Sequence, residues 1–181
     1  VRDWSSDVCS SDLTFVIEAA MLAANIAPGL KRGFLSGKWS NLIDKQVWDD
    51  AYEEAREMVS IDTNVDIQGY DIDKSVVEAA RSNATRAGVM DMLHLQCRDV
   101  ASLSHPKKYG FIITNPPYGE RLEEKENLPA IYKSLGDRYA ALDSWSLYLI
   151  TSYDDAQKYI GREADKNRKI YNGMMQTRFY Q

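Results

Sequence analysis

The most constraining stretch of this sequence is FIITNPPY, residues 111–118, in which an apolar run meets a polar residue and two prolines. The run Phe111–Thr114 is typical of a buried strand, because apolar and β-branched side chains fit a sheet that is covered on both faces. Prolines cannot donate to a strand ladder, so the strand is predicted to end at residue 114. At its carboxyl edge, where open α/β sheets bind ligands, the chain then presents Asn115, Pro116, Pro117 and Tyr118.

This tetrapeptide combines hydrogen-bond acceptors with an aromatic face. The prolines fix φ and carry no N–H, so carbonyl oxygens lie beside the Asn115 side chain. Acceptors aimed at the two N–H groups of an exocyclic amino group help its lone pair localise towards an electrophile. A base splayed out of its stack could rest on Tyr118. The pattern therefore indicates transfer chemistry at the amino nitrogen of a planar base, and the alternative without function is a strand closed by a proline-rich turn.

Strand-like and helix-like stretches alternate along most of the chain. The predicted helices are Thr14–Ala27, Lys45–Val59 capped by Asp44, Ser75–Ala87 ended by Gly88, Asn127–Leu142 with Leu128, Ile131, Leu135 and Tyr139 facing the sheet, and Asp154–Ile160. The predicted strands are Ile67–Tyr70, Met92–Cys97, Phe111–Thr114, Trp145–Ser152 and a hairpin of Arg168–Asn172 and Met174–Tyr180 that turns at Asn172–Gly173. Between these elements we expect an irregular excursion over 28–43 anchored by Trp39 and a charged loop over 120–127.

The alternation predicts an α/β fold with a doubly wound, mostly parallel sheet and helices on both faces. The terminal hairpin would make the last strand antiparallel.

Acidic residues follow two of the predicted strands. Asp71 comes directly after Ile67–Tyr70, where a carboxylate suits the hydroxyls of a ribose. Asp99 and Val100 follow Met92–Cys97, where the Asp99 carboxylate could accept from an adenine amino group and the Val100 N–H could face a ring nitrogen. An aspartate at such a position is as often a helix cap or turn former. At successive strand ends the two aspartates together favour a nucleoside site.

Composition limits the function classes. The chain has 181 residues, a length that fits one globular domain. Its net charge of −5, with a pI near 5.1, argues against a protein that binds nucleic acid by overall positive charge. Any grip on nucleic acid must be local or come from a partner domain. Cys9 and Cys97 lie far apart without metal-ligand spacing, so no metal and a reducing compartment are expected. No apolar run reaches the length of a membrane span, because Glu18 interrupts the best candidate, and no signal peptide is evident; we expect a soluble cytoplasmic protein.

Residues 14–181 resemble the catalytic domain of bacterial THUMP-domain RNA methyltransferases, which make N2-methylguanine in 23S ribosomal RNA and are often labelled N6-adenine-specific DNA methylases. The segments that carry the resemblance are TFVIEAAMLAANIAPGL, GYDID, ARSNATRAG, ITNPPYGERL, LPAIYKSLGDRY and RKIYNGMMQTRFYQ. The resemblance implies a class I, Rossmann-like methyltransferase fold, S-adenosylmethionine as cofactor and 23S ribosomal RNA as partner. It also implies that RNA is bound through an N-terminal module that this sequence lacks.

The resemblance assigns roles to individual residues. Asn115, Pro116, Pro117 and Tyr118 would be catalytic, and Tyr118 and Arg121 would contact the substrate. The cofactor would be bound by Thr14, Asp71, Ile72, Asp99, Val100 and Asn115, with no metal.

Residues 1–13 depart from the family pattern. In the family a central strand and a loop of the form Asp-Pro-x-Cys-Gly-Ser-Gly precede the helix that begins here at Thr14, whereas this chain has Asp7-Val8-Cys9-Ser10-Ser11-Asp12-Leu13. Ser11 and Leu13 occupy glycine positions, where side chains are expected to crowd the cofactor and leucine to resist a positive φ. We therefore expect residues 1–13 to be a non-native, loop-forming segment in front of a methyltransferase domain over 14–181, and the central first strand to be missing or degraded.

Three functions remain open. The leading one is S-adenosylmethionine-dependent methylation of guanine N2 in 23S ribosomal RNA. The alternatives are N6-adenine methylation of DNA, which shares the NPPY motif, and a catalytically dead fragment or scaffold that has lost the glycine-rich loop. A nicotinamide-dependent oxidoreductase is disfavoured, because the sequence contains no GxGxxG.

Overall fold

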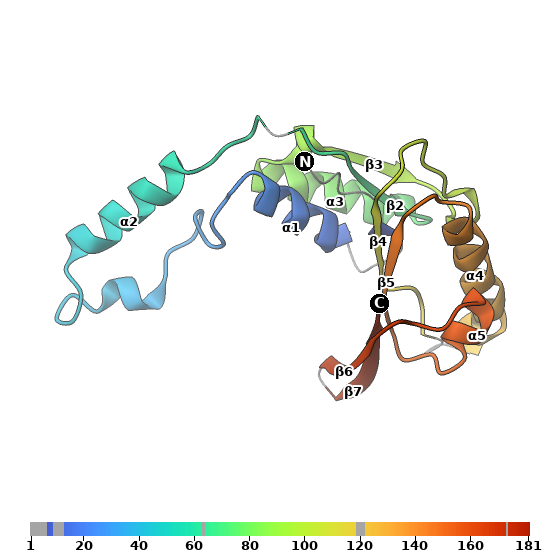
Figure 1. Ribbon diagram of the computed structural model, residues 1–181. Helices are drawn as coiled ribbons and strands as arrows, with labels where there is room; N and C mark the ends of the chain where they lie inside the picture. The colour runs from blue at the N-terminus through green and yellow to red at the C-terminus, as the bar shows by residue number, and fades with distance from the viewer. Residues whose placement is uncertain (1–6, 9–12, 63, 119–121, 173) are drawn as a thin grey trace.

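A single seven-stranded sheet organises the protein, which we describe from a computed structural model over residues 7–8, 13–62, 64–118, 122–172 and 174–181. The strands lie in the order β3-β2-β1-β4-β5-β7-β6 (Figure 1). The first five strands of that order pair in parallel, whereas β7 pairs antiparallel with both β5 and β6. The predicted doubly wound α/β sheet with an antiparallel terminal hairpin is thus confirmed.

Helices and strands alternate as the sequence predicts. The strands are β1 (Asp7–Val8), β2 (Ile67–Asp71), β3 (Leu93–Cys97), β4 (Phe111–Thr114), β5 (Ser146–Thr151), β6 (Asn167–Asn172) and β7 (Met175–Tyr180). The α-helices are α1 (Thr14–Ala23), α2 (Lys45–Glu57), α3 (Lys74–Ala87), α4 (Leu122–Ala140) and α5 (Ala156–Ile160). Short 3-10 turns are η2 (Leu35–Lys38), η3 (Met90–Met92) and η4 (Val100–Ser102).

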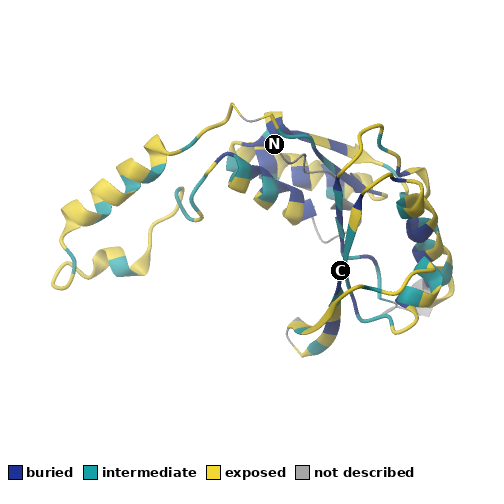
Figure 2. Ribbon diagram, in the orientation of Figure 1, coloured by how far each residue is buried: buried dark blue, intermediate teal, exposed yellow. Residues whose placement is uncertain are grey.

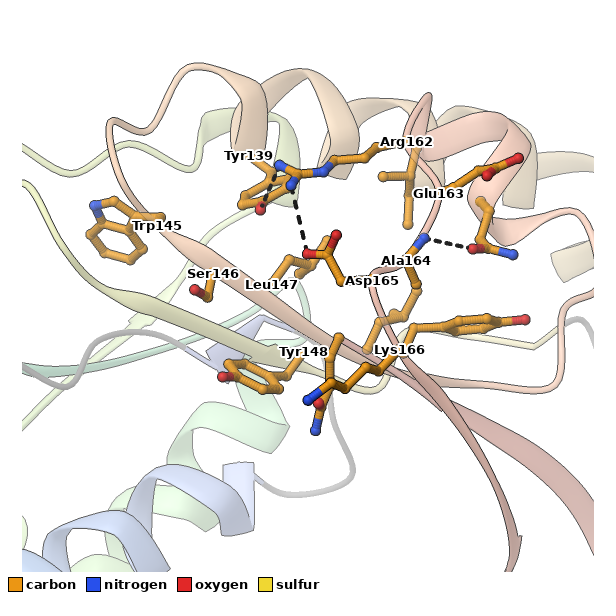
Figure 3. A pocket seen from close by; sticks show the side chains of 15 residues that line it. Tyr139, Trp145, Ser146, Leu147, Tyr148, Arg162, Glu163, Ala164, Asp165 and Lys166 are labelled. Atoms are coloured by element: carbon orange, nitrogen blue, oxygen red, sulfur yellow. Dashed lines mark hydrogen bonds and ion pairs between the residues drawn. The ribbon is translucent and has the colours of Figure 1, made fainter.

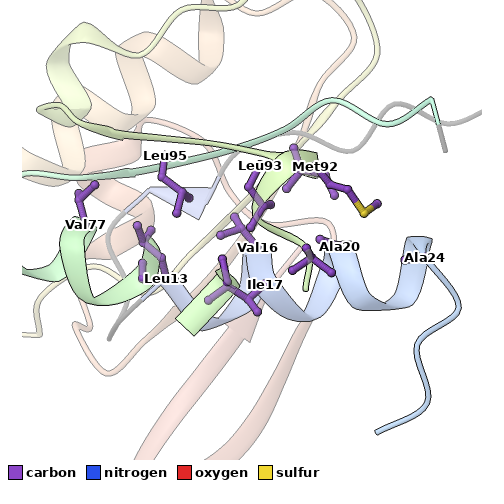
Figure 4. Packing of buried hydrophobic residues seen from close by; sticks show 13 residues of the cluster. Leu13, Val16, Ile17, Ala20, Ala24, Val77, Met92, Leu93 and Leu95 are labelled. Atoms are coloured by element: carbon purple, nitrogen blue, oxygen red, sulfur yellow. The ribbon is translucent and has the colours of Figure 1, made fainter. Parts of the chain in front are cut away.

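One face of the sheet is covered by α1 and α3. Their buried side chains meet those of β2 and β3 in one apolar cluster, part of which Figure 4 shows. The buried positions Val16, Ile17 and Ala20 of α1, together with Ala24 just past its end, form a single stripe, as expected for a helix that packs on a sheet. Gly69 of β2 allows the helix to approach, since a Cβ there would lie 2.7 Å from the Leu95 side chain and 3.2 Å from Val16.

The opposite face is covered by α4, with α5 and η4 packed against it. Its cluster contains Leu128, Tyr132 and Leu135 of α4, Ile112 of β4 and Leu149 of β5. Tyr70 of β2 also belongs to this cluster. Because side chains alternate along a strand, β2 contributes Ile67 to one face and Tyr70 to the other and so joins the two halves of the core.

The short strand β1 lies at the centre of the sheet. Asp7 pairs with Gly69 of β2 on one side and with Ile113 of β4 on the other. The prediction of loop over residues 1–13 is therefore wrong for residues 7 and 8, although the strand that they form has only two residues. Flanking strands with apolar faces can recruit even a sequence with little strand propensity.

Leu13 corrects a second expectation, namely that leucine would resist a positive φ. Its backbone has φ 52° and ψ 33°, in the left-handed region, at the start of α1. Its side chain is fully buried in the cluster with α1, α3 and β2 (Figure 4). Burial of a leucine side chain contributes about 1.5–3 kcal/mol, which offsets a left-handed cost of about 1–2 kcal/mol. Residues 9–12, including Ser11 of the expected cofactor loop, lie outside the described residues.

The segment between α1 and β2 extends away from the sheet, and most of it is exposed (Figures 1 and 2). Asp44 caps α2 as predicted, its carboxylate accepting from the Gln46 N–H at 2.9 Å. The expected anchor Trp39 is 49% exposed. Trp48 of α2 takes that role instead, with its ring 5.9 Å from Phe34 and 6.4 Å from Tyr52 between centroids.

Two predicted helix boundaries are wrong by more than two residues. The first helix ends at Ala23 and not at Ala27, because Asn25 turns into the left-handed region at φ 53° ahead of Pro28. The expected loop over 120–127 is helical from Leu122, and Pro129 lies inside α4. Pro129 is the eighth residue of this helix, past the first turn, so α4 lacks one backbone hydrogen bond there, to the carbonyl of Lys125. The hairpin of β6 and β7 is confirmed, with Asn172 paired to Met175, while the predicted turn residue Gly173 lies outside the described residues.

None of the described helices has the length and apolar character needed to cross a membrane.

Gly136 should be essential to the contact between α4 and α5. A Cβ at this position would lie 2.3 Å from the carbonyl oxygen and 2.7 Å from the Cα of Ile160. Within a helix, Gly→Ala normally raises the free energy of unfolding by about 1 kcal/mol. Displacing a packed backbone lowers it by about 1–3 kcal/mol. We expect Gly136→Ala to lower the urea midpoint of unfolding. Gly33→Ala is the control and should leave the midpoint unchanged, because nothing lies within 4 Å of the new methyl group. A midpoint for Gly136→Ala equal to or above that of the parent would contradict this packing.

Candidate active site

The predicted site residues gather at the carboxyl edge of the parallel strands. Asp7 of β1 is level with Gly69 on one side and Ile113 on the other, so Asp71 and Asn115, each two residues further on, face each other across β1. Two strand spacings separate them, about 10 Å. The order of the strands reverses between β1 and β4, and the crevice at such a switch point is where open α/β sheets bind ligands.

Asp71 ends β2 with its side chain only 8% exposed. Its Oδ1 accepts the backbone N–H of Asp73 at 2.8 Å, which turns the chain from the strand into α3. Its carbonyl oxygen accepts the Arg98 N–H at 2.9 Å, so the loops after β2 and β3 are joined. Ile72 follows with 63% of its side chain exposed. The edge thus offers a fixed carboxylate beside an uncovered apolar surface.

Asp99 follows β3 at the same edge and is exposed. Its Oδ1 accepts the Ala101 N–H at 2.7 Å, so it caps η4, the local role weighed against nucleotide binding. One carboxylate oxygen can serve a cap while the other accepts from a ligand. Arg98 holds the turn: its guanidinium lies 5.0 Å from the Tyr70 ring centroid and donates to the Ser102 carbonyl at 2.5 Å.

The tetrapeptide after β4 has contacts on both of its sides. Within it, the Tyr118 hydroxyl donates to Oδ1 of Asn115. On the side of α4, the carbonyl oxygen of Pro117 accepts the Tyr132 hydroxyl at 3.2 Å. Pro116 is buried, whereas Asn115, Pro117 and Tyr118 are half-buried. A base that uses Oδ1 of Asn115 as acceptor therefore either shares this oxygen with the Tyr118 hydroxyl or replaces it.

Sequence reasoning missed Tyr132. The sequence predicted that α4 faces the sheet with Leu128, Ile131, Leu135 and Tyr139. In the structure Ile131 and Tyr139 are only half-buried, whereas Tyr132 is fully buried. The signal lay in the spacing of Leu128, Tyr132 and Leu135 at i, i+4 and i+7, which is an equally good helical stripe. A tyrosine in such a stripe needs a partner for its hydroxyl, and its partners are Pro117 and Thr151.

Two further predicted site residues are Thr14 and Arg121. Thr14 is exposed at the start of α1. Arg121 lies outside the described residues. In the part of the chain that the structure describes, no three His, Cys, Asp or Glu side chains come together as a metal site requires.

A cavity of about 330 Å³ lies elsewhere, along the first half of β5 (Figure 3). It is lined by residues 145–149, by 162–166 after α5, and by Tyr180 and Gln181. Arg162 spans it, donating to the Tyr139 hydroxyl at 3.2 Å and pairing with Asp165 at 3.8 Å. None of the predicted site residues lines this cavity, since the tetrapeptide follows the opposite, carboxyl end of the parallel strands.

Comparison with protein families shows which family the chain belongs to. The family model UPF0020, an RMKL-like methyltransferase domain, matches residues 13–181. The chain belongs to this family. Its match covers every described element except β1.

Curated relatives agree with the family. YpsC of Bacillus subtilis (strain 168), named as a candidate RNA methyltransferase, is 38% identical over 180 residues, which cover 99% of this chain and 46% of YpsC. Ribosomal RNA large subunit methyltransferase K/L of Shewanella baltica (strain OS185) is 35% identical over 170 residues, covering 92% of this chain and 24% of that enzyme. The chain thus spans less than half the length of these relatives.

Solved structures share the fold closely. A possible methylase from Clostridium difficile 630 superposes with a TM-score of 0.93 at 43% identity, over 98% of this chain and 47% of that one. SMU.472, a candidate methyltransferase crystallised with SAH, superposes at 0.92 with 36% identity, over 99% and 47%. A protein from Listeria monocytogenes 4b F2365, described as a predicted N6-adenine-specific DNA methylase, superposes at 0.89 with 38% identity, over 99% and 46%.

Proposed function

We propose that this protein is an S-adenosylmethionine-dependent RNA methyltransferase that methylates the N2 amino group of a guanine in 23S ribosomal RNA in the cytoplasm. The single observation that carries the proposal is the placing of Asn115 and a rigid prolyl segment level with Asp71, across one strand at the switch point of the sheet. Family membership and the names of the relatives favour RNA as the substrate. One solved relative was crystallised with the demethylated cofactor, SAH.

The described residues fit the cofactor. Asp71 would accept from the ribose hydroxyls, and Asp99 and the Val100 N–H would contact the adenine. The exposed Ile72 side chain lies next to Asp71 and offers an apolar surface for the adenine ring. Thr14 at the helix start would complete the site. When bound, the cofactor supplies an activated methyl group on a sulfonium.

The protein's own contribution is to hold the target amino nitrogen. Oδ1 of Asn115 and a prolyl carbonyl would accept its two N–H bonds, which leaves the nitrogen lone pair directed at the methyl group. The Pro117 carbonyl already accepts from Tyr132 on the side of α4, so we assign the second acceptor to Pro116. Tyr118 would release Asn115 and stack on the base, while Arg121 would contact RNA phosphate. A sulfonium is a strong electrophile, so positioning accounts for much of the rate and no general base is needed.

Two alternatives keep specific support. The name of the Listeria relative favours N6-adenine methylation of DNA, which would use the same tetrapeptide. A domain without activity is favoured by Ser11 and Leu13, which stand where the family pattern has glycines. We also propose that residues 1–13 are not the native segment of this domain, and loss of activity would be a consequence of that replacement.

A methyl-transfer assay distinguishes these three functions. Labelled methyl groups are transferred from S-adenosylmethionine to unmodified 23S ribosomal RNA or to DNA. We expect N2-methylguanosine in the RNA, identified by mass spectrometry of nucleosides. Asn115→Ala should lower the rate about 100-fold, the usual effect of removing one preorganised polar group, whereas Asn127→Ala on the exposed face of α4 should not change it. N6-methyladenine in DNA would support the first alternative, and no transfer to either substrate would support the second.

Asp71 should govern affinity for the cofactor. Asp71→Asn keeps the shape and the acceptor for the Asp73 N–H but loses the charge, so affinity for S-adenosylhomocysteine should fall about tenfold by calorimetry. Asp73→Asn is the matched control, because Asp73 caps α3 two residues away and asparagine caps a helix equally well. Equal affinities for the two variants would remove Asp71 from the cofactor site.

Tyr118 should act through its ring and not through its hydroxyl. Stacking of a base on an aromatic ring contributes about 1–3 kcal/mol, so Tyr118→Ala should raise KM for RNA about tenfold or more. Tyr118→Phe keeps the ring and frees Oδ1 of Asn115, so its kcat/KM should stay within about threefold of the parent. An equal loss in both variants would show that the hydroxyl is needed and that stacking is not the main contribution.

A further inference from the structure

The hydroxyls of Tyr132 and Thr151 form a chain of hydrogen bonds that ends on the catalytic tetrapeptide. Tyr132 is fully buried on α4, and Thr151 is 1% exposed at the end of β5. The Tyr132 and Thr151 hydroxyl oxygens lie 2.5 Å apart, and the Tyr132 hydroxyl lies 3.2 Å from the carbonyl oxygen of Pro117. At the other end, the Tyr153 N–H donates to the Thr151 hydroxyl at 3.0 Å.

The direction of every bond in this chain is fixed by its two ends. A backbone N–H can only donate, so Thr151 accepts from Tyr153. A carbonyl can only accept, so the single Tyr132 proton is donated to Pro117. The proton between the two hydroxyls must then belong to Thr151. All three donors point one way, from the end of β5 to the tetrapeptide after β4, and aligned bonds of this kind strengthen one another.

The packing around Tyr132 keeps the chain in place. Its ring lies 5.1 Å from that of Tyr153, between centroids, and Leu128 and Leu135 flank it on the same helix face. Burial raises the pKa of the Tyr132 phenol, so the hydroxyl keeps its proton at physiological pH and beyond. The donor to Pro117 is therefore neutral, buried and permanently protonated.

We propose that Tyr132, itself oriented by Thr151, is a positioning residue that fixes the peptide between Pro117 and Tyr118 and thereby the acceptors offered to the target base. Its effect on catalysis rests on the proposed function, whereas its effect on the peptide does not. The competing explanation is that the bond to Pro117 only gives the buried Tyr132 hydroxyl a hydrogen-bond partner and has no effect on the tetrapeptide. In that case its removal would change stability without changing the tetrapeptide.

Nuclear magnetic resonance can read this peptide directly. Pro117–Tyr118 is the one place in the sequence where tyrosine follows proline. Labelling proline carbonyls with ¹³C and tyrosine nitrogens with ¹⁵N thus gives a single correlated signal. A carbonyl that loses a hydrogen bond shifts upfield, so Tyr132→Phe should move the Pro117 signal upfield, and Thr151→Val should move it in the same direction by less. Thr151→Ser retains the hydroxyl and should restore the parent position.

Thr114 provides a matched control. It is 1% exposed, lies on the same face of the sheet as Ile112, directly precedes Asn115, and has a buried hydroxyl with no hydrogen-bond partner among the described residues. Thr114→Val therefore removes a buried hydroxyl next to the tetrapeptide without breaking a bond. The Pro117 signal and kcat should both stay at their parent values.

Kinetics of methyl transfer give the second readout. Loss of one buried hydrogen bond corresponds to roughly a three- to tenfold change, so Tyr132→Phe should lower kcat by that factor. KM for RNA and for S-adenosylmethionine should not change, since Tyr132 would touch neither. An unmoved Pro117 signal in Tyr132→Phe would overturn the proposal, as would a moved signal with the kcat of the parent. If the parent itself transfers no methyl group, the proposed function fails, and the Pro117 signal alone then decides whether Tyr132 orients the peptide.

Discussion

The backbone hydrogen bonds that the two residues of β1 make with β2 and β4 hold the rest of the structure together. On one side of β1 lie β2 and β3 with α1 and α3, and on the other lie β4 and β5 with α4 and α5. Asp7 pairs with both neighbours, so its register alone sets Asp71 level with Asn115. A shift of one residue at β1 would displace Asp71 relative to Asn115 by about 3.3 Å, more than the proposed methyl transfer would tolerate.

The second link between the halves consists of side chains. Tyr70 belongs to β2 but packs in the cluster of α4, where Arg98 lies over its ring. Arg98 also ties the turn of η4, and its N–H is bonded to the Asp71 carbonyl. The loops that carry Asp71 and Asp99 are therefore fixed to each other and to the core that supports the tetrapeptide. This is the rigidity that a reaction driven by positioning requires.

The sequence was sufficient to predict the alternation of strands and helices, the antiparallel hairpin, the caps at Asp44 and Gly88, and the grouping of Asp71, Asp99 and Asn115 at one edge. Each of these depends on local periodicity, on capping chemistry or on the geometry of parallel sheets. It was not sufficient for β1 or Leu13, because neighbouring strands and a buried pocket override local preference there. The buried role of Tyr132 was also missed. Helical periodicity allowed two stripes on α4, and only packing against β5 and the tetrapeptide selects between them.

The tetrapeptide is held by an outer hydrogen bond at Asn115 and an inner one at Pro117. The Tyr118 hydroxyl occupies Oδ1 of Asn115, an acceptor that an incoming amino group would claim. The Tyr132 hydroxyl donates to the Pro117 carbonyl from the protein interior, where Tyr132 is fully buried. Exchange of the outer bond costs little, since one donor replaces another on the same oxygen. Loss of the inner bond would leave the Pro117 carbonyl without this donor. In the proposed reaction the side chain of Tyr118 would therefore leave Asn115 and stack on a base while the backbone beneath it stays in place, which would separate substrate entry from alignment.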